Sequence, residues 1–553
     1  MNSLMKKAIA TVAAAATALG LAAVTGATAN AAGENATLTV STSDAKFAGK
    51  TANAYKMFDA DVTGSGSSRT VTYKLDDNWK TFFTTTTDGT SGAPCSDNDA
   101  LDQCSSDYVK GLKDDALRSF AQKAAIWAQR NDIAAVTPAA KISDAVNNEG
   151  KYTGSFTGLD YGYYVVAVPG ASVIDAKSQY ASLVSVHEQP ASVEIKGELP
   201  TVDKKVNDKD AIDAKIGQQL TFTLTSTIPD MTAYDSYTFN FVDTLSKGLT
   251  LVQNVTDPQN PVFEPTVTIT DGTTTDTLTK DTDYTTTVDA ADKDGNVMLH
   301  VNMKDFKAKH LKDAGKTITV TYKATLNENA IVGGTGNTNS ASIHYTTNPK
   351  NTESGDSQPD TVRTYTYGFT IDKYTGTYGT NAKRLAGAKF QLQDASGAEI
   401  PVVQESAGSE TEAAVYRVAT SGETAATEIV TPNSGKLTFK GLANGKYLLE
   451  ETEAPKEYNK LANKIGINIE GDNGKADPAK ATVSVTYDNN AGADNYDQSA
   501  VEDAKGQKTI IPVKNESGVT LPGTGGMGTV AFTVVGVLIV AFGIAWAIRR
   551  KRA

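Results

Sequence analysis

The residues best suited to chemistry are a lysine, an acid and an asparagine that each end a run of alternating apolar side chains. Residues two apart on a strand share one face, so the alternation predicts that Lys373, Glu451 and Asn515 point into a core. A lone charge there would cost roughly several kcal/mol. The apolar residues of the three runs are Phe369 and Ile371, Tyr447 and Leu449, and Ile511 and Val513.

A second set of the same residue types occurs earlier in the chain, in the same order. Alternation aligns Lys204, Asp243 and Asn339 with apolar neighbours. Two assignments stay open, because Lys205 adjoins Lys204 and Asn337 shares a face with Asn339. The apolar neighbours are Val202 and Val206; Tyr237, Phe239 and Phe241; and Ala341, Ile343 and Tyr345.

These residue types suit one reaction. Burial lowers the pKa of a lysine and raises that of a carboxyl group, so the pair can exist as a neutral amine and a neutral acid. The amine then attacks the asparagine carboxamide, the acid polarises its oxygen and moves protons, and ammonia leaves. The product is an amide cross-link between two side chains, formed once. The alternative, a strand end that reaches solvent, suits any one of the six residues, but their matching order favours the cross-link.

Strands are expected to position these residues. Short alternating runs separated by Asp-Gly, Asn-Gly and Gly-Lys turns predict an all-β chain of tandem immunoglobulin-like sandwiches. Residues 38–40, 193–195, 317–322 and 483–487 are examples. One amphipathic helix is expected in the first domain, over residues 107–130. Its apolar face comprises Val109, Leu112, Ala116, Phe120 and Trp127.

Breaks in the pattern divide the body of the chain. They fall near residues 197–200 and in the polar stretch 349–362. The predicted domains are therefore a first domain (residues 32–197), a middle domain (198–360) and a third domain (361–517).

Composition excludes several classes of protein. The 553 residues carry 52 basic and 64 acidic side chains, and the net charge of −12 argues against nucleic acid as a partner. Cys95 and Cys104 lie close together in a polar segment and are expected to form a local disulfide. The histidines lack metal-ligand spacing, and residues 292–296 suit a hairpin turn better than a calcium loop. No metal, cofactor or catalytic triad is expected.

The two ends carry targeting signals. Residues 1–31 combine two lysines, an apolar run and a small-residue cleavage site, which is typical of a secretory signal peptide. Residues 530–548 form an uncharged apolar stretch long enough to be a transmembrane span, and four basic residues follow it. A short motif precedes the stretch. Its residues are Leu521, Pro522, Gly523, Thr524 and Gly525.

This three-part ending, residues 518–553, resembles the LPxTG cell-wall sorting signal of Gram-positive surface proteins. In that family a sortase cleaves between the threonine and the glycine, here Thr524 and Gly525, and joins the threonine to an amine.

Two internal segments resemble domains of the same kind of protein. Residues 447–458, YLLEETEAPKEY, resemble the E-box of Cna B-type domains in Gram-positive pilins, except that Glu457 stands where the pattern has glycine; LAGAKF at 385–390 resembles that family's opening strands. The resemblance implies an isopeptide bond between Lys373 and Asn515, assisted by Glu451. DTLSKGL at 243–249 resembles the acid-bearing segment of Cna A-type domains. It implies that Asp243 assists a bond between Lys204 and Asn339.

The first domain contains GYYVV at 162–166 without a following acid of the E-box kind, so no cross-link is expected there. The family places the lysine used for polymerisation at the end of this domain, where KGELP at 196–200 offers Lys196. The Tyr-Pro of many relatives is here Glu194 and Ile195. Val193 and Ile195 are expected to face inward, which leaves Lys196 reachable. The alternative is an ordinary solvated lysine beside a linker.

Most of the chain resembles the major (backbone, or shaft) pilin of Gram-positive sortase-assembled pili, and the motifs are most specific in the third domain and the sorting signal. The resemblance implies a secreted, cell wall-anchored subunit of a surface pilus (fimbrium), not an enzyme, that is joined through Thr524 to Lys196 of the next subunit and supports adhesion. The expected partners are sortase, identical subunits, minor pilins, peptidoglycan and host surface proteins or glycans. The alternative is a monomeric wall-anchored adhesin that binds host protein or glycan.

Overall fold

The computed structural model describes most of the body of the chain. The described residues are 36–64, 70–85, 94–95, 100–172, 180–187, 190–254, 261–379, 381–472, 481–486, 500–502 and 507–517. The predicted signal peptide, the sorting motif Leu521–Gly525 and the apolar stretch 530–548 lie outside them. Within the described part, no helix is both long and apolar enough to cross a membrane.

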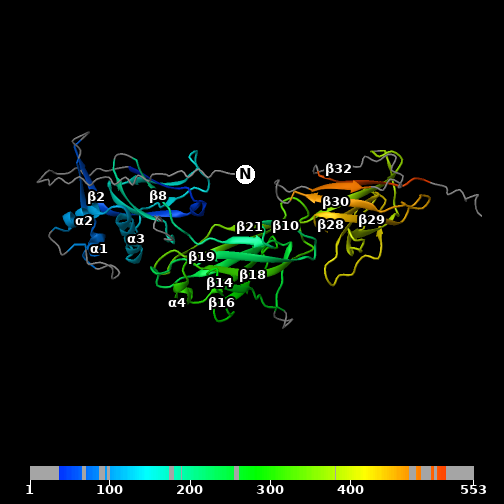
Figure 1. Ribbon diagram of the computed structural model, residues 1–553. Helices are drawn as coiled ribbons and strands as arrows, with labels where there is room; N and C mark the ends of the chain where they lie inside the picture. Colours follow the sequence, from blue (N-terminus) through cyan, green and yellow to red (C-terminus); the bar gives the residue numbers. More distant parts are fainter. Residues whose placement is uncertain are drawn as a thin grey trace, which may run out of the picture. The chain divides into compact units, whose positions relative to one another are not determined.

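The described chain is mostly strand, as predicted (Figure 1). It forms two compact units. The first unit contains Met1–Asp210, Leu220–Ala324 and Thr338–Val362, and the second contains Ala211–Gln219, Thr325–Asn337 and Arg363–Ala553. The first unit thus holds the predicted first domain and most of the middle domain. The division into three domains stays a prediction.

The first domain contains two small sheets. One has the strand order β5-β1-β8, and the other has the order β3-β2-β6-β7, with β4 paired to β2. β8 runs parallel to β1, which places the segment before Lys196 at the edge of the first sheet. The strands are β1 (Ala36–Thr42), β2 (Thr51–Thr63), β3 (Thr70–Leu75), β4 (Ala140–Lys141), β5 (Tyr152–Leu159), β6 (Gly162–Ala167), β7 (Ala181–Val186) and β8 (Ala191–Glu194).

The prediction of one helix in this domain is wrong. The described residues form α1 (Lys80–Thr84), α2 (Leu101–Gly111) and α3 (Asp114–Arg130) (Figure 1). They pack with β2, β6 and β7 around one apolar cluster. The expected single helix is interrupted between α2 and α3. Gly111, a poor helix former, ends α2, and the backbone of Leu112 and Lys113 is extended. Leu112 then packs against the cluster, whereas Ala116, predicted to share the apolar face, is exposed.

The middle domain is a sandwich of two sheets. One has the order β15-β14-β18-β11-β9, with β13 on β18, and the other contains β21-β19-β12-β17-β16, with β20 on β19. Every second residue of β11, β12, β18 and β19 is buried, as two sheets facing one core require.

The elements of this domain follow one another closely. They are β9 (Asp203–Val206), β11 (Gln219–Thr227), β12 (Phe239–Leu245), β13 (Leu249–Leu251), β14 (Thr266–Thr270), β15 (Thr275–Thr277), β16 (Tyr284–Val288), β17 (Val297–Met303), α4 (Phe306–His310), β18 (Thr317–Leu326), β19 (Asn337–Thr346), β20 (Ser354–Asp356) and β21 (Asp360–Tyr365). The short β10 (Ala211–Asp213) pairs in parallel with residues 363–365 of β21.

The third domain forms a sheet with the order β25-β26-β28-β22-β33-β31-β30-β29-β24-β27, in which β22 and β33 are parallel neighbours. β23 pairs with β22, and β32 pairs with β33. The strands are β22 (Tyr367–Thr375), β23 (Lys383–Arg384), β24 (Lys389–Asp394), β25 (Val402–Ser406), β26 (Ala414–Val418), β27 (Ile429–Val430), β28 (Lys436–Leu442), β29 (Gly445–Glu453), β30 (Ile465–Gly471), β31 (Ala481–Thr486), β32 (Val501–Glu502) and β33 (Lys508–Lys514).

Candidate functional site

The third domain brings Lys373, Glu451 and Asn515 together in its core. Lys373 lies on β22, opposite Val513 of the parallel strand β33, and Asn515 follows the end of β33. Glu451 lies on β29. The side chains are almost fully buried, with relative exposures of 0%, 1% and 1% for Lys373, Glu451 and Asn515. The alternation in the sequence therefore predicted their orientation correctly.

The two carboxylate oxygens of Glu451 face the two residues proposed to react. Lys373 Nζ lies 2.8 Å from Oε1, although the two atoms are not aligned for a hydrogen bond. Asn515 Nδ2 donates to Oε2 at 3.1 Å and to the carbonyl of Asn459 at 2.7 Å. Oε2 also accepts the backbone N–H of Leu461 at 2.8 Å. One acid thus contacts both the amine and the carboxamide.

The surroundings of Lys373 favour its uncharged form. Burial lowers the pKa of Lys373 from 10.5 to about 8, and the attraction of Glu451 offsets only part of that shift. The amine also lies over the ring of Phe390, with 5.5 Å between Nζ and the ring centre. Because only the neutral amine has a free lone pair, the lowered pKa makes Lys373 a better nucleophile near neutral pH.

The middle domain brings together the second predicted set. Lys204 lies on β9 in one sheet, while Asp243 on β12 and Asn339 on β19 belong to the opposite sheet. Their relative exposures are 0%, 3% and 0%. Lys204 Nζ donates to Asp243 Oδ2 at 2.6 Å. Burial lowers the pKa of Lys204, and the attraction of Asp243 opposes this shift.

Both alternatives left open by the sequence have other partners. Lys205 is partly exposed and pairs with Asp203 and Asp210, each at 2.6 Å. Asn337 accepts the N–H of Ile331 at 2.8 Å and donates to the carbonyl of Thr364 at 3.1 Å. The structure therefore places Lys204 against Asp243, and it buries Asn339 on β19, the strand next to β12.

A fourth polar residue of this site, Tyr322 on β18, was not predicted from the sequence. Its hydroxyl donates to Asp243 Oδ2 at 2.7 Å and accepts from Asn339 Nδ2 at 2.6 Å. A signal was present, because Tyr322 alternates with Ile318 and Val320 and so shares their inward face. A tyrosine does not stand out among apolar residues in the way that a charged residue does.

The remaining predicted residues lie apart from these two sites. Val193 and Ile195 are buried as expected, while Lys196 is partly exposed and pairs with Glu194 at 3.2 Å. Cys95 and Cys104 form the expected disulfide.

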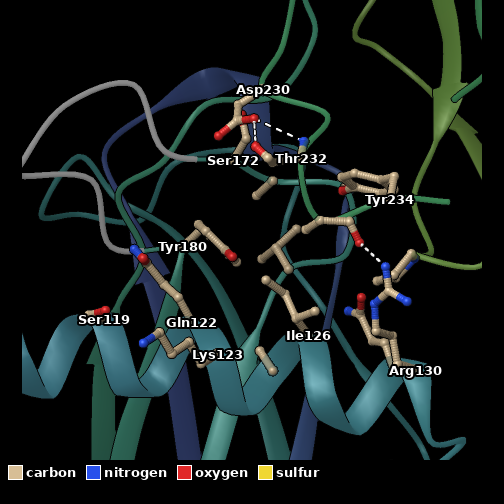
Figure 2. Close-up of a pocket in the computed structure, with 17 residues that line it drawn as sticks. Ser119, Gln122, Lys123, Ile126, Arg130, Ser172, Tyr180, Asp230, Thr232 and Tyr234 are labelled. Atoms are coloured by element: carbon tan, nitrogen blue, oxygen red, sulfur yellow. Dashed lines mark hydrogen bonds between the residues drawn. The ribbon is translucent and has the colours of Figure 1, made fainter. Parts of the chain in front are cut away.

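The first unit also contains an open cavity of about 620 Å³ beside α3 (Figure 2). Figure 2 shows two of its polar side chains engaged by neighbouring groups. Arg130 donates to the carbonyl of Ala233 at 2.8 Å, and Asp230 accepts the backbone N–H of Thr232 at 2.9 Å. The two contacts of Arg130 tie α3 to residues 233–235 within the unit, because Arg130 also pairs with Asp235 at 3.0 Å.

Glu457 occupies the position where the E-box pattern has glycine, and its backbone is left-handed, with a φ of 73°. A side chain strains such a backbone by about 1–2 kcal/mol, whereas glycine adopts it freely. We therefore expect Glu457→Gly to raise the free energy of unfolding of the third domain by about 1 kcal/mol, measured by calorimetry. Lys456→Gly is the control, since Lys456 has no positive φ and its replacement should lower stability. An unchanged or lower melting temperature for Glu457→Gly would contradict the strain argument.

Three segments of the chain match models of known families. Residues 216–349 match the Gram-positive pilin backbone subunit 2, Cna-B-like domain, residues 373–483 match the SpaA prealbumin-like fold domain, and residues 513–553 match the LPXTG cell wall anchor motif. The description of the first match is Cna-B-like, whereas the sequence analysis expected a Cna A-type domain there.

One curated relative is the trypsin-resistant surface T6 protein of Streptococcus pyogenes, 26% identical over 356 residues. The alignment covers 59% of this chain and 55% of the T6 protein, so it spans about half of that relative.

Two solved structures illustrate the structural comparison. The T6 backbone pilin of Streptococcus pyogenes matches with a TM-score of 0.39 and 17% identity, over 79% of this chain and 82% of that chain. The major pilin SpaA of Corynebacterium diphtheriae matches with a TM-score of 0.40 and 14% identity, over 87% of this chain and 99% of that chain. From the sequence matches, the chain is a homologue of Gram-positive backbone pilins, with a pilin backbone domain, a prealbumin-like domain and an LPXTG cell wall anchor motif.

Proposed function

We propose that this chain is the structural shaft subunit of a covalently polymerised surface pilus, strengthened by two internal isopeptide bonds. The observation that carries the proposal is the pair of buried sites, each with a lysine, an acid and an asparagine. The family matches and the wall anchor motif support the same function.

In each site the lysine amine attacks the carboxamide carbon of the asparagine, with loss of ammonia. The contacts of Glu451 with Lys373 and Asn515 support this role in the third domain. The bond between Asp243 and Lys204 supports it in the middle domain. Each residue reacts once, so the chain is a structural subunit rather than an enzyme.

Subunits are joined between Thr524 of one chain and Lys196 of the next. Lys196 follows β8 at the end of the first domain, and its side chain is 43% exposed. That exposure supports its access to an acyl-enzyme formed by a sortase. The wall anchor motif then attaches the finished polymer to peptidoglycan, and minor pilins and host adhesion are further expected partners and roles.

We expect Lys196→Ala to abolish the ladder of high-mass covalent polymers that the wild-type chain forms on Gram-positive cells carrying its sortase. The measurement is a denaturing gel of wall extracts. Lys151→Ala is the matched control, because Lys151 pairs with the other oxygen of Glu194, at 3.5 Å. Its ladder should be unchanged.

Two outcomes would contradict the proposal. An unchanged ladder for Lys196→Ala would place the polymerising amine on another lysine. A wild-type chain that forms no ladder would instead indicate a monomeric wall-anchored adhesin.

A further inference from the structure

The acids of the two sites differ in length and in the contacts that they make. In the third domain, the two oxygens of Glu451 contact both the lysine amine and the amide nitrogen of Asn515. In the middle domain the acid is an aspartate, which is one methylene shorter. There the amide nitrogen of Asn339 donates to the hydroxyl of Tyr322, which in turn donates to the aspartate.

The middle site thus contains an unbroken chain of short polar contacts from the amine to the carboxamide. Lys204 Nζ lies 2.6 Å from Asp243 Oδ2, that oxygen lies 2.7 Å from the hydroxyl of Tyr322, and the hydroxyl lies 2.6 Å from Asn339 Nδ2. The first atom is the nucleophile, and the last is the nitrogen that must leave as ammonia.

We propose that Tyr322 is a catalytic proton-transfer residue, which passes a proton from Asp243 to the departing nitrogen of Asn339. The inference rests on the proposed function, because it requires that Lys204 and Asn339 react. It adds a proton-transfer role for the tyrosine, whose hydroxyl contacts the departing nitrogen.

The atoms balance in three steps. The lone pair of Lys204 Nζ forms a bond to Asn339 Cγ, and the carbonyl electrons move to Oδ1. Nζ then gives a proton to Asp243, Asp243 passes a proton to Tyr322, and Tyr322 gives its own proton to Nδ2. The bond between Cγ and Nδ2 breaks as the carbonyl re-forms, ammonia leaves, and both Asp243 and Tyr322 end in their starting forms.

The packing of Tyr322 suits this role. Its ring stacks on that of Phe222 with 5.4 Å between centres, and the edge of Phe263 closes another side at 5.8 Å. Burial raises the pKa of Tyr322 well above 10, and the negative charge of Asp243 adds to the shift. Tyr322 therefore stays protonated until a neighbouring group supplies a replacement proton, as a proton relay requires.

The third domain offers an internal comparison. The aromatic ring that faces Lys373 is Phe390, which has no hydroxyl. Glu451 contacts Asn515 directly, so a relay is unnecessary there. A glutamate without a neighbouring hydroxyl and an aspartate with one are two ways to connect the lysine amine to the asparagine carboxamide.

The test is Tyr322→Phe, which removes one oxygen and keeps the ring, in the soluble chain from residue 32 to 517. Samples taken at intervals after a pulse of synthesis are digested, and mass spectrometry measures the loss of ammonia at each site. General acid–base catalysis contributes about 100- to 10,000-fold, so the middle-domain bond should form at least about 100-fold more slowly. The Lys373–Asn515 bond of the same molecules should form at the wild-type rate.

Tyr284→Phe is the matched control. It also removes a buried tyrosine hydroxyl from the middle domain, one that donates to the carbonyl of Pro265 at 2.7 Å. In this variant the Lys204–Asn339 bond should form at the wild-type rate. That result would separate the chemistry of Tyr322 from a general loss of stability.

A rescue variant tests the argument on length. Asp243→Glu combined with Tyr322→Phe should restore bond formation, because a glutamate can reach the carboxamide as Glu451 does. Equal rates for Tyr322→Phe and the wild type, or a double variant as slow as Tyr322→Phe, would overturn the role of Tyr322. A wild-type chain that never loses ammonia in the middle domain would instead overturn the proposed cross-link itself.

Discussion

Replacing Glu451 with alanine is expected to leave Lys373 and Asn515 unjoined and to lower the stability of the third domain sharply. Intact mass spectrometry of the soluble wild-type chain should show the loss of two ammonia molecules, and the variant should regain one. The missing bond would have closed a loop of well over a hundred residues, which by analogy with a disulfide stabilises by roughly 4–5 kcal/mol. The removed acid also leaves the buried Lys373 without its counter-charge.

Glu450→Ala is the control for this result. Glu450 is the chain neighbour of Glu451 but faces the other way, where it pairs with Lys464 at 3.1 Å. An exposed pair of this kind is worth about 0–1 kcal/mol, so this variant should keep both bonds and nearly all of its stability. A Glu451→Ala chain that still loses two ammonia molecules would remove the acid from the mechanism.

The second large effect is on pH dependence. In Asn515→Ala, Lys373 remains a free amine whose pKa in the folded chain, about 8, lies below its ordinary 10.5. Between these values the unfolded state binds more protons than the folded state, so the free energy of unfolding rises with pH. Calorimetry should show the free energy of unfolding rising by about 2 kcal/mol between roughly pH 8.5 and 10. This gain is lost as the pH falls toward 8.

The matched control is the double variant Asn515→Ala/Lys373→Met, which lacks the titrating amine. Its free energy of unfolding should not rise over the same pH range. The same is expected of the wild type, in which the nitrogen of Lys373 is part of an amide. If Asn515→Ala and the double variant respond alike to pH, Lys373 is not the titrating group.

Strand alternation alone identified which side chains point inward. It was sufficient for Lys373 and Glu451, which lie on β22 and β29 in line with buried residues, and for Asn515, which directly follows β33. Alternation does not say which strands face one another across a core. That information comes from sheet order, which depends on pairings between residues far apart in the chain.

The misses have the same physical origin. The role of Tyr322 depends on β18 lying next to β11 and facing β12 and β19, which no local pattern encodes. The break between α2 and α3 depends on Leu112 reaching a core built from distant strands, which outweighs helical periodicity. The choice of Asn339 over Asn337 depended on the loop at Ile331, whose backbone engages Asn337.

The position of Asn339 early in β19 has a consequence for how far a subunit can lengthen. If the two proposed bonds form, residues 205–338 and 374–514 lie inside closed covalent rings and add nothing to the contour length of a stretched chain. The stretch between Asn339 and Lys373 is outside both rings, and it contains most of β19 together with β20 and β21. These 33 residues could span at most about 110–120 Å when fully extended. Between Lys196 and Thr524 it would therefore be the longest of the three stretches that tension can extend, the others being residues 197–203 and 516–523.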